Sequence, residues 1–257
     1  MKRASIVGLV VLGGIFTASV GTAQQGGEGV LDLPLTSSPA WKSIPLRDAL
    51  GHLGSAVGGD SYVLFGLEEE LYNGQDPRVD LEVEPEMTLG GALHEILAQL
   101  PPYELEVVSD HLINLRPVGA KQDTNNILNL VVPSFDAVSQ PAYIILSAPL
   151  DVIPELNEAL TPKPEPGKHV ITLYSRLGGN DGPPITLHPR NATIRAILNA
   201  ASEATEPFFP DQDPHGWVYA FDPDPPAGHL KHSWQALFSM QLHSIQRKKS
   251  GQKSPDK

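Results

Sequence analysis

The sequence contains no cysteine, and this absence removes several classes of chemistry. Disulfide bonds, a cysteine nucleophile, thiolate metal sites and iron–sulfur clusters are all excluded. Basic residues are also scarce: 18 lysines and arginines stand against 30 aspartates and glutamates, and the net charge is −12. Five of the basic residues lie in the stretch 247–257, so the rest of the chain is more acidic still. Because an acidic body repels phosphate backbones, we expect no nucleic-acid binding.

The N-terminus has the pattern of an export signal. A basic start is followed by residues 4–20, which carry no charge, and then by small residues before Gln24. This order is typical of a secretory signal peptide. We therefore predict a signal peptide over residues 1–23, cleaved between Ala23 and Gln24, and an exported protein that is periplasmic or extracellular. The alternative is a retained anchor, which would be the chain's only contact with a membrane, although about 20 apolar residues are normally needed to span one.

Two amphipathic helices are predicted in the first half of the mature chain. Apolar residues recur at helical spacing over 46–57, directly after Pro45, whose fixed φ suits a first turn. The same spacing recurs over 89–100, with Thr88 as the N-cap. Strands are predicted at 61–64 and 81–83, a hairpin at 103–115, and a Gly-, Ser- and Pro-rich linker at 24–43.

The pattern of small and apolar residues in this half is similar to that of a known domain. It consists of an Ala-Leu pair in each helix, a Thr-Leu pair at the start of the second helix, two intervening strands and a closing hairpin. The residues that carry this pattern are Ala49-Leu50, Tyr62-Val63, Leu81-x-Val83, Thr88-Leu89, Ala92-Leu93 and Tyr103 to Leu115. Residues 44–116 thereby resemble the short N-terminal domain shared by secretins and TonB-dependent receptors. The resemblance implies a periplasmic interaction fold over 44–118 whose partners are envelope proteins. We expect no pore or barrel domain after it.

The second half, residues 127–222, repeats the order of elements more loosely. Strands are predicted at 127–132, 142–146, 169–174, 184–187 and 217–221, and helices at 152–160 and 194–205. We therefore expect a mixed α/β (α+β) fold built from two small two-layer α/β sandwich modules. The first core should contain Leu50, Leu53, Leu93, Ile96 and Leu97, and a separate second core should contain Ile197 and Leu198.

The region 223–257 is predicted to hold an amphipathic helix followed by a basic, disordered tail. Trp234, Leu237 and Phe238 begin an apolar stripe at helical spacing that continues to Ile245. Such a stripe is too large to leave in water, so we expect the helix to pack on the chain's own body. Binding to a partner or to a membrane surface is the alternative.

Few residue patterns point to catalysis. His229 and His232 lie one helical turn apart and are weak metal-ligand candidates, since a zinc site needs three or four converging ligands. Glu68-Glu69-Glu70 is interpreted as a solvated loop run, and two Asp-x-Asp pairs, at 211–213 and 222–224, as turn formers.

The function predicted from these observations is that of an exported, non-catalytic envelope protein that serves as a protein–protein interaction or scaffold module, with no cofactor. The alternative is a secreted metal-binding protein or metal-dependent hydrolase that uses His229 and His232. A ligand-binding module with a cleft between its two domains would leave no mark in the sequence.

Overall fold

The structure is a computed structural model that describes residues 28–37, 40–57, 61–71, 75–160, 184–205, 215–224 and 231–238. The predicted signal peptide with its cleavage site, the expected strand at 169–174, His229 and the tail after Phe238 lie outside the described residues. The helices are α1 (Glu28–Leu31), α2 (Leu46–Ala56), α3 (Leu89–Gln99), α4 (Ala142–Ser147), α5 (Pro149–Val152), α6 (Pro154–Leu160), α7 (Ile194–Glu203) and the 3₁₀ turn η1 (Ile127–Asn129). The strands are β1 (Ala40–Pro45), β2 (Leu64–Glu70), β3 (Arg78–Glu82), β4 (Tyr103–Val107), β5 (Leu112–Pro117), β6 (Val131–Ser134), β7 (Ala137–Pro141), β8 (Pro184–Leu187), β9 (Arg190–Thr193), β10 (His215–Phe221) and β11 (His232–Phe238).

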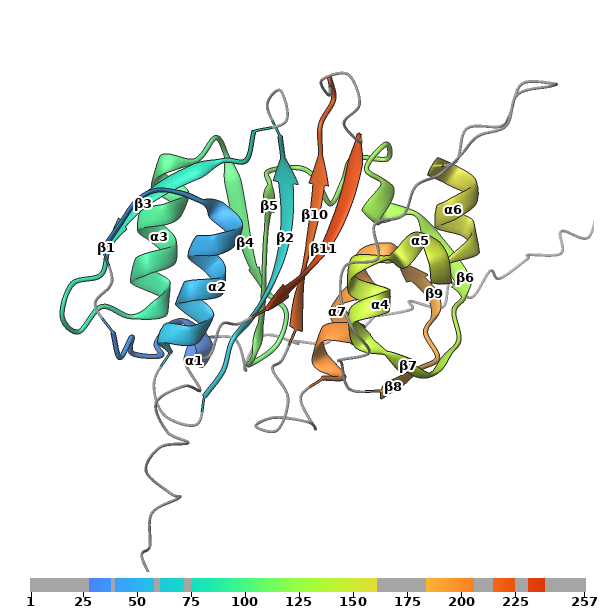
Figure 1. The fold of residues 1–257 in the computed structure, drawn as a ribbon, viewed down its shortest axis with the longest axis horizontal. Helices are drawn as coiled ribbons and strands as arrows, with labels where there is room; N and C mark the ends of the chain where they lie inside the picture. Colours follow the sequence, from blue (N-terminus) through green and yellow to red (C-terminus); the bar gives the residue numbers. More distant parts are fainter. Residues whose placement is uncertain are drawn as a thin grey trace, which may run out of the picture.

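A mixed five-stranded sheet with the order β11-β10-β2-β5-β4 runs through the centre of the molecule (Figure 1). β10, β2 and β5 are parallel, and the two edge strands, β11 and β4, are antiparallel to their neighbours. The fold is mixed α/β, as predicted. The arrangement within it differs from the prediction, because β2, β4 and β5 come from the first half of the chain and β10 and β11 from the second. The two expected modules therefore share one sheet.

One face of this sheet is covered by α2 and α3, which lie between it and the two-stranded sheet of β1 and β3 (Figure 1). The first core forms here, and it contains Leu50, Leu53, Leu93 and Ile96, with Leu97 partly buried beside them. α3 begins where Thr88 predicts it, since the Thr88 side chain accepts a hydrogen bond from the Gly91 amide. Helical spacing thus places both helices, and a local cap fixes the start of α3.

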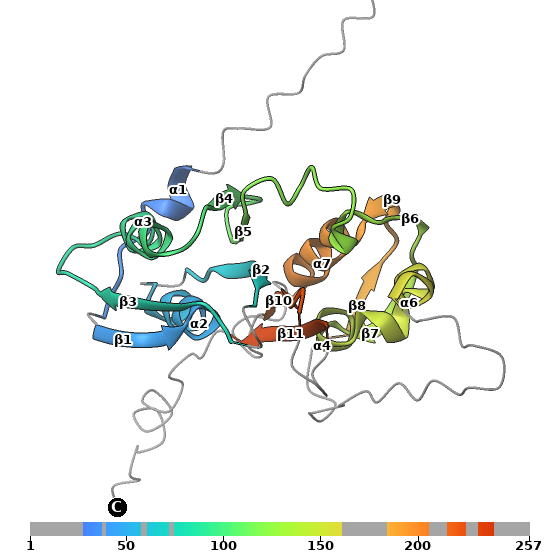
Figure 2. The same ribbon diagram turned by 90° about the horizontal axis from the view of Figure 1, so that it is seen from above.

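The opposite face is covered by α4 and α7, with the ribbons β6–β9 and β7–β8 beyond them (Figure 2). Ile197 and Leu198 of α7 are buried in a second core, as predicted. Alternate residues of β10 divide between the two cores: Val218 belongs to the first, whereas Trp217 and Tyr219 belong to the second. The two cores therefore lie on opposite faces of the sheet, because successive side chains of a strand point to alternate faces.

The predicted C-terminal helix is wrong, because residues 232–238 form the strand β11. β11 pairs with β10 over all seven residues. In a strand, Trp234 and Leu237 point to opposite faces. Here Trp234 packs against the second core, and Leu237 packs against the first core. Apolar cover on both faces and a complete ladder of backbone hydrogen bonds favour the strand over an amphipathic helix.

Four further predictions on secondary structure are corrected. The strand predicted at 127–132 is the 3₁₀ turn η1 up to Asn129, and β6 begins only at Val131. Residues 142–146 form the helix α4, since a short apolar run fits a buried helix as well as a buried strand. The expected linker 24–43 contains α1 and the start of β1, and Val30 is buried in the first core. The strand predicted at 61–64 begins only at Leu64 and continues to Glu70. Within the described part of the chain, no helix is both long enough and apolar enough to cross a membrane.

Candidate functional site

The three glutamates at the end of β2 are the clearest departure from the sequence prediction. Glu68 and Glu69 are 3% and 2% exposed, so the interpretation of a solvated loop run is wrong. They occupy the carboxyl end of a strand that lies between β10 and β5. Because successive side chains of a strand alternate, Glu68 faces α7 and Glu69 faces α2, and two buried carboxylates lie on opposite faces of the sheet.

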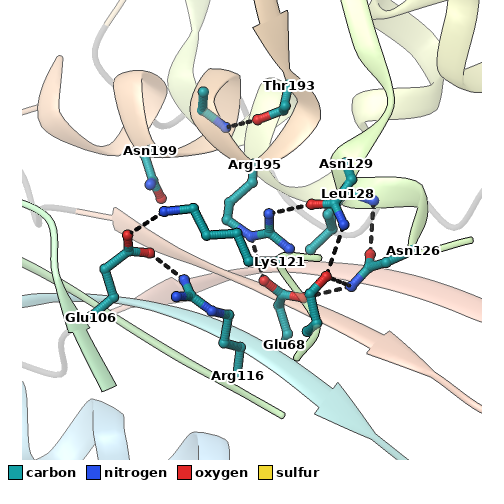
Figure 3. Close-up of polar contacts among 12 residues, drawn as sticks. Glu68, Glu106, Arg116, Lys121, Asn126, Leu128, Asn129, Thr193, Arg195 and Asn199 are labelled. Atoms are coloured by element: carbon teal, nitrogen blue, oxygen red, sulfur yellow. Dashed lines mark hydrogen bonds and ion pairs between the residues drawn. The ribbon is translucent and has the colours of Figure 1, made fainter. Parts of the chain in front are cut away.

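Glu68 is the centre of a buried polar cluster (Figure 3). Its carboxylate accepts hydrogen bonds from Nε of Arg195 on α7 and, at 2.9 Å, from Nδ2 of Asn126. Arg195 in turn donates from Nη1 to Oδ1 of Asn129 at 2.6 Å. A buried charge without its partner costs several kcal/mol. The pair therefore holds α7 on β2 and attaches the segment after β5 to the same point.

A second ion-pair cluster lies beside it on β4 and β5 (Figure 3). Arg116 donates from Nε to Glu104 at 2.7 Å and from Nη1 to Glu106, and Lys121 Nζ bonds Glu106 at 2.7 Å. Although partial burial acts to raise the pKa of Glu106, the hydrogen bonds from Lys121 and Arg116 hold that pKa below its ordinary value. Glu106 is thus a stably ionised group and not a proton donor near neutral pH.

Glu69 lies in a different environment on the other face. Its side chain is fully buried, its oxygens accept no hydrogen bond from the described residues, and Nη2 of Arg47 is 3.6 Å away. Arg47 is shared, because it also pairs with Asp76 and donates to Oε1 of Gln235 at 2.9 Å. Burial raises the pKa of Glu69 to about 7, against the lowering effect of Arg47 and with a further increase from Asp76. The carboxyl can therefore change its protonation state near neutral pH.

The structure places the weak metal-ligand candidate His232 on β11, away from any set of ligands. Its Nδ1 is 2.8 Å from the Tyr219 hydroxyl, and its ring lies against Tyr219 and Phe221. Burial, with a smaller contribution from Lys231, lowers the pKa of His232. Among the described residues no three His, Asp or Glu side chains are placed to hold a metal ion, and His229 lies outside them.

A groove of about 390 Å³ runs along the segment 121–131. Its described lining residues all come from this one stretch of chain, so no second described element contributes a chemical group to it. Two of the lining residues, Asn126 and Asn129, already bond Glu68 and Arg195. The groove is therefore the outer surface of the Glu68 cluster.

The two edges of the central sheet differ in charge. The outer strand β4 carries Glu104 and Glu106, which are typical of a protected edge. The seven residues of β11 include no Asp, Glu, Lys, Arg or Pro. Among the described residues β11 pairs with β10 alone, and the buried indole Nε1 of Trp234 has no hydrogen-bond acceptor. Within the part of the chain that the structure describes, one end of the sheet is thus an uncharged, seven-residue edge.

No protein-family model, no curated protein and no solved structure matches the chain.

The sequence analysis missed the charged residues that organise both faces of the sheet, Glu68, Glu69, Arg47, Arg116 and Arg195. A signal was present in the run 62–67, which is apolar apart from Gly66 and leads directly into Glu68. The positive partners carry no such signal, because Arg195 is 127 residues away from Glu68 in the sequence.

Proposed function

We propose that the chain is an exported, non-catalytic envelope protein that acts as a protein–protein interaction or scaffold module. The observation that carries this proposal is the uncharged edge strand β11. An exposed sheet edge binds an extended segment of another chain through backbone hydrogen bonds, and alternate side chains supply specificity. Such binding needs no catalytic group or cofactor.

Two further observations support the proposal. The order α2, β2, β3, α3, β4, β5 is the order that the resemblance to the short N-terminal domain of secretins and TonB-dependent receptors implies. Two charged groups of the sheet have structural partners: Glu68 is bonded by Arg195, and Glu106 by Arg116 and Lys121. Groups committed to such pairs hold elements together and do not contact a substrate.

Photo-cross-linking in the envelope tests the proposal. A photoreactive amino acid at Gln235, an exposed position of β11, should give a protein adduct upon irradiation of cells. The matched control carries the same amino acid at Glu82, an exposed position of β3 in the two-stranded sheet, and should give little adduct. Equal adducts at both positions, or none at Gln235, would contradict an interaction through β11. Recovery of the chain from the cytoplasm alone would contradict the export part.

A further inference from the structure

The residues of β11 are self-complementary about the middle of the strand. Gln235 is the fourth of its seven residues. If two copies of β11 run antiparallel with Gln235 opposite Gln235, Trp234 of each copy lies opposite Ala236 of the other, and Ser233 lies opposite Leu237. Each of these two inner pairs sets a large side chain against a small one on the same face of the sheet, and the outer pair sets His232 opposite Phe238. Such an arrangement lets the side chains of two identical strands interdigitate without a clash.

We infer that β11 pairs antiparallel with β11 of a second copy of this chain, about a two-fold axis through Gln235. This inference rests on the proposed function and names its partner. The two five-stranded sheets then form one continuous sheet, with β4 as the outermost strand at each end. The uncharged edge of each copy is covered by the other copy, and the remaining edges carry Glu104 and Glu106.

The packing already present inside the chain fits this pairing. Across β10 and β11, Ala236 is opposite Trp217 and Trp234 is opposite Tyr219. A second copy would set its Trp234 on the free side of Ala236, so each alanine would lie between two indole rings. Small residues between large ones on neighbouring strands are the arrangement that packs a sheet face densely.

Electrostatics favour this edge over other surfaces for contact between two copies. The chain has a net charge of −12, so two copies repel each other wherever acidic side chains meet. β11 contains none, whereas β4 and the outer strand β3 carry Glu104, Glu106, Asp80 and Glu82. Gln235 on the axis is exposed and neutral, and its amide has two N–H donors in addition to the oxygen that accepts from Arg47.

The absence of cysteine allows a direct test of the register by disulfide trapping. In Gln235→Cys the two introduced thiols would lie opposite each other across the axis, with Cα atoms about 4.5–5.5 Å apart, within the range of a disulfide. The matched control, Ser233→Cys, lies on the same strand and the same face. Its two copies would be separated by four residues of strand, or roughly 13 Å, which is too far for a disulfide.

Under mild oxidation, Gln235→Cys should convert to a disulfide-linked dimer on a non-reducing gel, and Ser233→Cys should stay monomeric. The unmodified chain should show twice its monomer mass by light scattering over a concentration series. Thermal unfolding of both reduced variants verifies that they remain folded. A monomeric mass at all concentrations, or cross-linking of Ser233→Cys as fast as Gln235→Cys, would overturn the inference. If Gln235 photo-cross-links to a different envelope protein while the chain is monomeric, the proposed function stands and the inference alone fails.

Discussion

Replacing Glu69 by glutamine should make the protein more stable at pH 8 and leave its stability nearly unchanged at pH 4, below the pKa of the unfolded chain. The Glu69 side chain is fully buried, and burial raises its pKa from 4.5 to about 7. Between these two values the folded state holds a proton that the unfolded state has released. The contribution of Glu69 to the free energy of unfolding is therefore most favourable at acidic pH, and it is lost as the pH rises through about 7.

The size of the effect follows from the pKa shift. One pKa unit corresponds to about 1.4 kcal/mol, so ionised Glu69 costs the fold about 3 kcal/mol at pH 8. Glutamine has nearly the same shape and no charge. At pH 4 the carboxyl is mostly protonated in the folded and in the unfolded chain and resembles the amide, whereas at pH 8 the glutamine variant avoids the burial of a charge.

Urea unfolding of both proteins from pH 4 to pH 8.5 measures this difference. Other titrating groups, including His232 and Glu106, are present in both proteins and cancel in the comparison. The exposed substitution Glu82→Gln on β3 serves as the control and should show no such pH-dependent difference. A variant that is less stable than the parent at pH 8 would refute the reasoning, because it would mean that Arg47 holds Glu69 ionised in the fold.

Three other substitutions or measurements test the rest of the structure. Arg195→Met should cost about 3–5 kcal/mol in urea unfolding, because Glu68 would keep a buried charge, and Arg190→Met in an exposed pair should cost far less. Gly66→Ala should cost about 1–3 kcal/mol, since a Cβ there would lie 2.6 Å from the Trp217 ring, whereas Gly29→Ala, which has nothing within 4 Å, should not clash. N-terminal sequencing of the envelope-fraction protein should start at Gln24, and an intact leader would contradict cleavage.

The sequence by itself determined the elements that depend on neighbouring residues. α2, α3 and α7 are found where the apolar spacing predicts them, and Thr88 caps α3 as expected. The hairpin of β4 and β5 and the composition of the two cores were also predictable. Caps, turns and the helical period act over a few residues, so one stretch of chain contains all the information they need.

The tertiary structure decided what depends on distant partners. Residues 232–238 fit a helix or a strand by their pattern, and pairing with β10 made them a strand. Glu68 resembled a solvated residue until Arg195 was brought to it from 127 residues away. An ionised side chain is buried only where an opposite charge offsets its desolvation, and an apolar stripe becomes a helix or a strand according to the surface it covers. Both outcomes are set by contacts that no local stretch of sequence contains.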